Sequence, residues 1–293
     1  MYKIVTIDLD GTLLNSRGEI SENNIKILRK CIDKGIEIVL TSGRITSSIL
    51  NFANLIGGTN YLIAGNGSCI YDINNKEVLY QNSLPKEKVL EIIKICEENS
   101  MYYSAYGEKS ILTKSYNHSI LFYAKENLNK VNKEKININI TEDIFSYVKN
   151  SDNPKISKIT ISDNDKIVFT SMVKKLKNIS HVDVLDVAHI SRKIIENGTE
   201  LVPIEFYYSE VMNENVNKWS AIERLIKKLD IKQEEVISIG DNLNDKEMLE
   251  NAGLGIAMGQ AAPYIKEFAD FITETNENDG VGKALQKYVL EEI

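Results

Sequence analysis

The sequence has few of the residues that build disulfide frameworks and zinc sites. It contains three cysteines and three histidines among 293 residues, and the cysteines, Cys31, Cys69 and Cys96, lie far apart. Neither a disulfide framework nor a zinc ribbon is expected from this pattern. Long apolar runs are also lacking, because no segment approaches the roughly 18 apolar residues that a membrane-spanning helix requires. We therefore expect no membrane partner.

Positive charge is in deficit as well. Lys and Arg number 35 against 42 Asp and Glu, which gives a net charge of −7. Such a chain is a poor candidate for binding a nucleic-acid backbone, although a local positive site can still hold a small anion. The first apolar stretch is interrupted by Asp8 and Asp10, so it does not read as a secretory signal, and we expect a cytoplasmic protein.

Apolar periodicity in the two terminal thirds alternates between strand and helix. A length of 293 residues favours two domains. The predicted strands are 4–7, 36–40, 61–64, 236–239, 254–257 and 271–273. The predicted helices between or after them include 25–32, 45–56, 218–229, 246–251 and 281–290. This alternation predicts βαβ units and a doubly wound, Rossmann-like parallel sheet.

The middle of the chain does not follow this alternation. Residues 69–71 and 78–80 flank Asn74-Asn75 and predict a hairpin. Strand-like pieces then occur at 102–106, 111–113, 156–161, 182–185 and 204–208, helix-like pieces occur near 117–130 and 165–177, and 127–153 is ambiguous. We expect residues 1–83 and 206–293 to form an α/β core and residues 84–205 to form an inserted α+β cap domain.

Three polar motifs directly follow predicted strands, and a lysine begins a predicted helix. The motifs are Asp8-Leu9-Asp10-Gly11-Thr12, Thr41-Ser42-Gly43-Arg44 and Gly240-Asp241-Asn242-Leu243-Asn244-Asp245, and the lysine is Lys218. The carboxyl ends of strands in a doubly wound sheet line one crevice, where ligands bind. Motifs separated by some two hundred residues are therefore expected to converge there.

The chemistry of these side chains points to phosphoryl transfer. The four carboxylates of the motifs, Asp8, Asp10, Asp241 and Asp245, would repel one another, and a divalent cation offsets such repulsion. Oxygen ligands without Cys or His favour Mg²⁺. Ser42 and Gly43 offer a hydroxyl and backbone N–H groups to an anion, and Lys218 adds a positive charge. A carboxylate nucleophile with these groups fits a reaction through an aspartyl-phosphate.

These motifs resemble those of the haloacid dehalogenase-like hydrolases. The resemblance extends to the Cof-like phosphatases, which carry a large α/β cap, through Gly65-Asn66-Gly67, Glu210-Val211 ahead of Asn217-Lys218, Ala257-Met258-Gly259 and Asn276-Glu277-Asn278-Asp279-Gly280-Val281. It covers the two core segments well and covers the cap only by position and size.

The resemblance implies a role for each residue of the motifs. Asp8 is the nucleophile and a Mg²⁺ ligand, Asp241 is a second ligand, and Asp10 is the general acid and base whose backbone carbonyl also binds the metal. The phosphoryl group is held by Leu9, Ser42, Gly43, Lys218 and Asn244. Asp245 supports the metal or Lys218, and Asn66 touches the substrate.

Some of these residues have simpler interpretations. Asp245 can instead cap a helix that begins near residue 246, and Asn66 can be a turn residue with positive φ. We expect Arg44 to have a structural role, paired with an acid. The three histidines, His118, His181 and His189, are expected at the surface or in packing, and the alternative is a histidine that lines the pocket of the leaving group.

The sequence thus predicts a Mg²⁺-dependent phosphomonoesterase that acts on a small soluble metabolite, with sugar phosphates as the expected class and the cap selecting the leaving group. A phosphomutase is less favoured, because Arg192 is the only arginine of the cap. A non-catalytic phospholigand sensor would lack Asp8, Asp10 or Lys218. A transport ATPase would carry Thr in place of Asp10, and a dehalogenase would need neither Asp10 nor Mg²⁺. The oligomeric state is not predicted.

Overall fold

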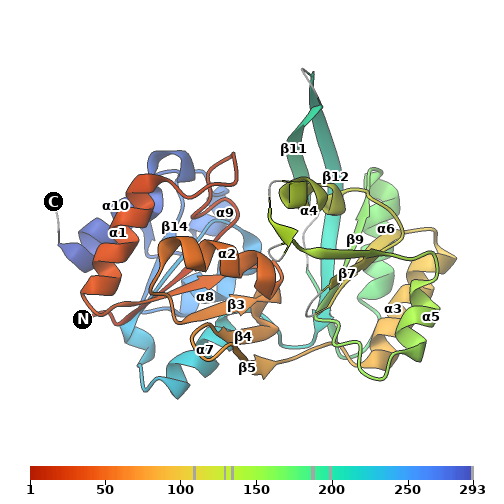
Figure 1. Cartoon of the computed structure of the whole chain (residues 1–293), viewed down its shortest axis with the longest axis horizontal. Helices are drawn as coiled ribbons and strands as arrows, with labels where there is room; N and C mark the ends of the chain where they lie inside the picture. Colours follow the sequence, from red (N-terminus) through yellow and green to blue (C-terminus); the bar gives the residue numbers. More distant parts are fainter. Residues whose placement is uncertain (108–109, 129, 133–134, 186–188, 198–199, 292–293) are drawn as a thin grey trace. The chain divides into compact units, whose positions relative to one another are not determined.

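Two sheets organise the chain, one in each of two units (Figure 1). The computed structural model describes residues 1–107, 110–128, 130–132, 135–185, 189–197 and 200–291. The first unit comprises Met1–Gln81 and Val216–Ile293, and the second unit comprises Asn82–Asn215.

The first unit is built on an eight-stranded sheet with the order β15-β14-β13-β1-β2-β3-β4-β5. The strands are β1 (Ile4–Asp8), β2 (Glu37–Thr41), β3 (Tyr61–Ala64), β4 (Cys69–Asp72), β5 (Glu77–Gln81), β13 (Val236–Gly240), β14 (Leu254–Ala257) and β15 (Phe271–Ile272). Neighbouring strands from β15 to β3 pair in parallel, whereas β4 and β5 continue the sheet as an antiparallel hairpin. The predicted doubly wound parallel sheet is confirmed.

Helices cover both faces of this sheet. They are α1 (Glu22–Asp33), α2 (Thr46–Ile56), α7 (Lys218–Lys228), α8 (Lys246–Asn251), α9 (Pro263–Lys266) and α10 (Gly280–Leu285), which continues into η6 (Gln286–Leu290). A capping box begins α7: Asn217 Oδ1 accepts a hydrogen bond from the Ser220 N–H, and Ser220 Oγ accepts one from the Asn217 N–H. Within the described ranges, none of the helices has the length and apolar character needed to cross a bilayer.

The alternation of side chains along β1 determines toward which helices its last residue, Asp8, points. Val5 and Ile7 pack in the core formed with α1, α2 and α10, whereas Ile4 packs in the core formed with α7 and α8. Thr6 shares the face of Ile4, and its hydroxyl lies 2.8 Å from Ser238 Oγ on β13. Since successive side chains of a strand point to opposite faces, Asp8 points to the α7 side of the sheet.

The second unit is an α+β unit, as predicted. Its sheet has the order β10-β12-β9-β6-β7-β8, and β11 pairs with β12 outside this path. The strands are β6 (Tyr102–Tyr106), β7 (Ser110–Thr113), β8 (Asn137–Ile140), β9 (Lys158–Asp163), β10 (Val182–Val184), β11 (His189–Asn197) and β12 (Glu200–Asn213), and the helices are α3 (Lys86–Glu98), α4 (Ser119–Leu128), α5 (Ile144–Asn150) and α6 (Lys166–Leu176). Helices α3, α5 and α6 cover one face of this sheet. The residues that they bury include Ile159 and Ile161 of β9.

The structure changes the interpretation of three segments of this unit. The ambiguous stretch 127–153 contains β8 and α5, and residues 189–197, which were not assigned to any element, form β11. The strand expected at 204–208 is part of the longer β12, which pairs with β9 as far as Met212 and with β10 as far as Asn213. The boundary expected between residues 205 and 206 therefore falls within a strand of the second sheet, and the units divide between residues 215 and 216 instead.

Candidate active site

Asp8 and Lys218, which lie 210 residues apart in sequence, form a buried ion pair. Lys218 is the first residue of α7, and its Nζ donates a hydrogen bond to Asp8 Oδ1 at 2.5 Å. The Lys218 side chain is fully buried, and that of Asp8 is 5% exposed. Among the described residues, no group donates a hydrogen bond to Asp8 Oδ2, although this oxygen is also buried. One oxygen of Asp8 is therefore held by Lys218, whereas the other has no donor among the described residues.

Asp245 uses both of its oxygens inside the protein. Asp245 Oδ1 accepts a second hydrogen bond from Lys218 Nζ at 2.5 Å. Asp245 Oδ2 accepts hydrogen bonds from the backbone N–H groups of Asp241 and Asn242, both at 3.0 Å. Its side chain makes no capping hydrogen bond to α8, which was the simpler interpretation. Asp245 thus holds the loop after β13 and the ammonium of Lys218 in place.

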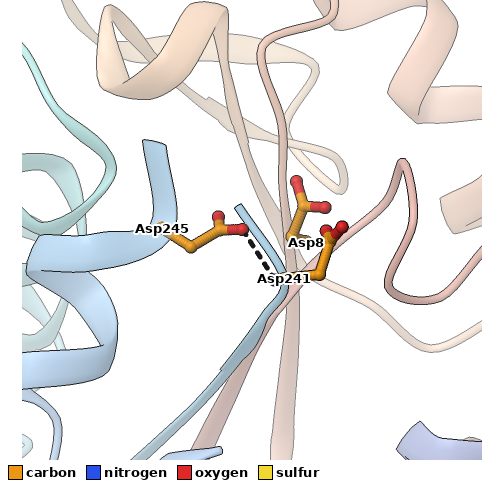
Figure 2. A group of neighbouring side chains, drawn as sticks. All are labelled: Asp8, Asp241 and Asp245. Atoms are coloured by element: carbon orange, nitrogen blue, oxygen red, sulfur yellow. Dashed lines mark hydrogen bonds between the residues drawn. The ribbon is translucent and has the colours of Figure 1, made fainter. Parts of the chain in front are cut away.

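Asp241 completes a cluster of three carboxylates. One oxygen from each of Asp8, Asp241 and Asp245 lies within 4.8 Å of the others, and Figure 2 shows the three side chains converging. Thr12 Oγ1 donates to Asp241 Oδ1 at 2.9 Å. Gly11 has φ +87°, and a Cβ at this position would lie 2.5 Å from Asp241 Oδ2. A glycine is therefore required for the loop after β1 to approach the carboxylate of Asp241 so closely.

The electrostatics of the cluster are unfavourable without a further cation. Burial raises the pKa of Asp8 well above its usual range, the ammonium of Lys218 lowers it, and the neighbouring carboxylates raise it further. Burial and the charge of Asp245 raise the pKa of Asp241 to about 7. Burial alone would lower the pKa of Lys218, but the carboxylates of Asp245 and Asp8 raise it above its usual value. Three carboxylates against one ammonium would leave a net charge of −2 in a buried site.

These residues fit a divalent metal ion. The buried oxygen Asp8 Oδ2, which no described residue satisfies, offers a ligand, and Asp241 lies beside it. The donor set consists of oxygen atoms, which Mg²⁺ prefers over nitrogen or sulfur. A bound cation would also favour the ionised forms of both carboxyls.

A second group of polar residues surrounds the loop after β2. Ser42 is buried, and its carbonyl accepts a hydrogen bond from the Asn66 N–H at 3.0 Å. Asn66 has φ 54° in the turn after β3, and its Oδ1 accepts a hydrogen bond from Asn244 Nδ2 at 3.0 Å. A Cβ on Gly43 would lie 3.0 Å from Asn66 Oδ1. Ser42, Gly43, Asn66 and Asn244 are thus brought together, as expected from the convergence of strand ends.

The remaining candidates are placed differently. The side chain of Leu9 is fully buried in the apolar core, so Leu9 can offer a ligand only its backbone. The carboxylate of Asp10 is not part of the acidic cluster, and Arg44 binds it instead. The sequence indicated that Arg44 pairs with an acid, but nothing in it identified that acid as Asp10. The contact of Thr12 with Asp241 was likewise not anticipated, although Thr12 belongs to the same motif as Asp8.

The sequence of this chain matches a known family over most of its length. A model of the haloacid dehalogenase-like hydrolases matches residues 5–285. The chain belongs to this family. The resemblance noted in the sequence motifs is therefore confirmed, and the match runs through both units.

Individual relatives of this haloacid dehalogenase-like hydrolase are phosphatases. The phosphatase YwpJ of Bacillus subtilis is 28% identical over 98% of this chain and 100% of its own length. The 5-amino-6-(5-phospho-D-ribitylamino)uracil phosphatase YcsE of Bacillus subtilis is 31% identical over 98% of this chain and 96% of its own. A crystal structure of a haloacid dehalogenase-like hydrolase from Bacteroides thetaiotaomicron has a TM-score of 0.78 and 28% identity, covering 98% of this chain and 99% of that one. The chain is accordingly an enzyme, a hydrolase of the phosphatase type.

Proposed function

We propose that this phosphatase requires Mg²⁺ and hydrolyses small phosphorylated metabolites, with sugar phosphates as the expected class, through an aspartyl-phosphate on Asp8. The observation that carries the proposal is the asymmetry of the Asp8 carboxylate, whose Oδ1 is bound by Lys218 while the buried Oδ2 has no donor among the described residues. A buried acceptor without a partner is costly. This cost supports a site that is completed by a cation and a phosphoryl group.

The proposed reaction has two steps. In the first, Asp8 attacks phosphorus, and the ester oxygen leaves with a proton from Asp10. In the second, Asp10 accepts a proton from the water that hydrolyses the aspartyl-phosphate. Asp8, Asp241 and the backbone carbonyl of Asp10 would hold Mg²⁺, and the ion would supply positive charge that offsets the charge of the carboxylates and of the phosphoryl group.

The other groups orient the phosphoryl group and offset its charge. The ammonium of Lys218 reduces the repulsion between the ionised Asp8 and the phosphate, and Asp245 keeps that ammonium in place. We assign the remaining contacts with the phosphoryl oxygens to the Ser42 hydroxyl, the backbone N–H groups of Leu9 and Gly43, and the amide of Asn244, with Asn66 orienting Asn244.

We further propose that the second unit selects the leaving group. The residues that carry the phosphoryl chemistry all lie in the first unit, so specificity for the rest of the substrate requires other side chains. We expected residues 84–205 to serve this purpose, and the corresponding compact unit is Asn82–Asn215. No oligomeric partner is proposed.

A phosphate-release screen with the full chain tests the proposed function. The panel should contain sugar phosphates, nucleotides and the phosphoribitylamino-uracil that names the relative YcsE. We expect activity with Mg²⁺, loss of activity after EDTA treatment, recovery when Mg²⁺ is returned, and no turnover by Asp8→Asn. Activity that survives exhaustive EDTA treatment, or hydrolysis by Asp8→Asn, would contradict the proposal.

A further inference from the structure

We infer that Arg44 is a positioning residue that directs the carboxyl of Asp10 toward the reacting ester. The inference rests on the proposed role of Asp10 as acid and base, and it assigns a function to a residue outside that proposal. Arg44 Nε donates to Asp10 Oδ2 and Arg44 Nη2 donates to Asp10 Oδ1, both at 2.8 Å. Two parallel hydrogen bonds from one planar guanidinium fix both the position and the plane of a carboxylate.

The guanidinium of Arg44 is itself anchored on α2. Arg44 Nη1 donates to Ser48 Oγ at 3.0 Å, and Ser48 is fully buried in this helix. Arg44 Cζ also lies 5.5 Å from the centre of the Phe52 ring, within the range of a cation–π contact. The Arg44 side chain is 15% exposed, whereas that of Asp10 is 48% exposed. A carboxylate that is half open to solvent is thus tied to a helix of the core.

The backbone of Arg44 joins the loop that we assign to the phosphoryl group. The Arg44 N–H donates to Ser42 Oγ at 3.2 Å, and the Arg44 carbonyl accepts from the Gly65 N–H at 2.9 Å. One residue therefore holds the loop of Ser42 through its backbone and Asp10 through its side chain. Substitution of the side chain separates these two functions, because the backbone hydrogen bonds can remain.

Arg44 places a positive charge beside Asp10, which offsets the repulsion that Asp10 meets from a neighbouring carboxylate. The charges of Asp10 and Asp241 repel each other. Each carboxylate oxygen has two lone pairs, so one hydrogen bond from Arg44 leaves a lone pair on the same oxygen. Arg44 can hold Asp10 while that carboxyl exchanges a proton with the leaving oxygen or with water.

Leaving-group dependence tests this inference. The value of kcat/KM should be measured with p-nitrophenyl phosphate, which has a good leaving group, and with phenyl phosphate, whose poorer leaving group depends more on the proton. General acid catalysis is worth about 10²–10⁴ in rate. We expect Arg44→Ala to lower kcat/KM for phenyl phosphate at least about tenfold more than for p-nitrophenyl phosphate. An unchanged ratio between the two substrates would overturn the inference.

Arg44→Lys keeps the charge and the aliphatic stem, and it serves if the alanine variant does not fold. An ammonium cannot reproduce two parallel hydrogen bonds. The ratio of kcat/KM between the two substrates should therefore shift in Arg44→Lys in the same direction as in Arg44→Ala. A wild-type ratio in Arg44→Lys would overturn the inference. Arg17→Ala is the matched control, because it removes an arginine of the same unit whose Nε binds Glu19 at 2.9 Å. This control should keep the wild-type ratio.

A double-mutant cycle shows whether Arg44 acts through Asp10. If it does, Asp10→Asn combined with Arg44→Ala should be within about twofold of Asp10→Asn alone with phenyl phosphate. A further tenfold loss in the double variant would overturn the inference. If Asp10→Asn alone retains wild-type activity, the proposed role of Asp10 fails. If Asp10→Asn is slow while Arg44→Ala keeps the wild-type ratio, only the role of Arg44 fails.

Discussion

Removal of the Lys218 ammonium should affect both the stability of the first unit and its chemistry. Lys218 Nζ binds Asp8 Oδ1 and Asp245 Oδ1, each at 2.5 Å, in a site without solvent exposure of the lysine. Lys218→Ala leaves two buried carboxylates without their cation, and breaking a buried ion pair costs about 3–5 kcal/mol of folding free energy. The same change removes one preorganised charge from phosphoryl transfer, which is worth about 10²–10³ in kcat/KM.

The assay combines thermal unfolding with hydrolysis of p-nitrophenyl phosphate at saturating Mg²⁺, below the unfolding temperature of the variant. We expect Lys218→Arg to restore little activity, because a planar guanidinium does not replace a compact ammonium between two carboxylates. Lys158→Met is the matched control: Lys158 is a buried lysine of the second unit, paired with Glu210. It should lose stability without a comparable loss of activity. Turnover near the wild-type value in folded Lys218→Ala would refute the assigned role.

Three further predictions concern pH and the second unit. Because the pKa of Asp241 rises from 3.8 to about 7 on folding, the metal-free protein should lose stability as pH rises through this window, and the increase in Tm caused by Mg²⁺ should grow over the same range. A Mg²⁺-induced shift that is independent of pH would contradict this. Burial lowers the pKa of His118 below 6.5, so the stabilisation by the neutral imidazole should be lost as pH falls below 6.5. In His118→Gln, Tm should therefore fall less steeply with decreasing pH than in the wild type. Substitutions in Asn82–Asn215 should change the ranking of substrates in kcat/KM and leave p-nitrophenyl phosphate hydrolysis nearly intact. Equal losses on all substrates would show that this unit does not select the leaving group.

The parallel core could be predicted because its local and tertiary signals agree. Residues 4–7 are a β-branched apolar run, as expected for a strand buried on both faces, and β1 is buried throughout. The polar motifs lie where strands end, so the rule for ligand sites in doubly wound sheets predicts that Asp8 and Asp241 lie close together. The side-chain alternation of β1 also places Asp8 on the side of α7, the helix that begins at Lys218.

The second unit was harder to predict for a physical reason that is visible in β12. Pro203 cannot donate a hydrogen bond to a neighbouring strand and argues against a central strand. In the structure, Pro203 pairs with Ile194 of β11, while the pairing of β12 with β9 begins only at Tyr207. Among the described residues, β12 therefore has a neighbouring strand on only one side at Pro203. A proline can occupy such a position without interrupting the strand.

The partner of Arg44 could not be predicted either. Arg44 and Asp10 come from different loops, and only the folded arrangement of β1 and β2 brings their side chains together. The sequence contains many acids that Arg44 could have reached.

The measurement that tests the central claim most directly is a rapid-quench experiment on Asp10→Asn with p-nitrophenyl phosphate and Mg²⁺. This substrate needs little help from a proton donor, so Asp8 should still be phosphorylated, while the second step lacks its base. The account predicts a burst of about one equivalent of p-nitrophenol per site, followed by a stall with an acid-stable phosphoenzyme, and no burst from Asp8→Asn. Absence of both burst and phosphoenzyme in folded Asp10→Asn would contradict an aspartyl-phosphate on Asp8 with Asp10 as acid and base.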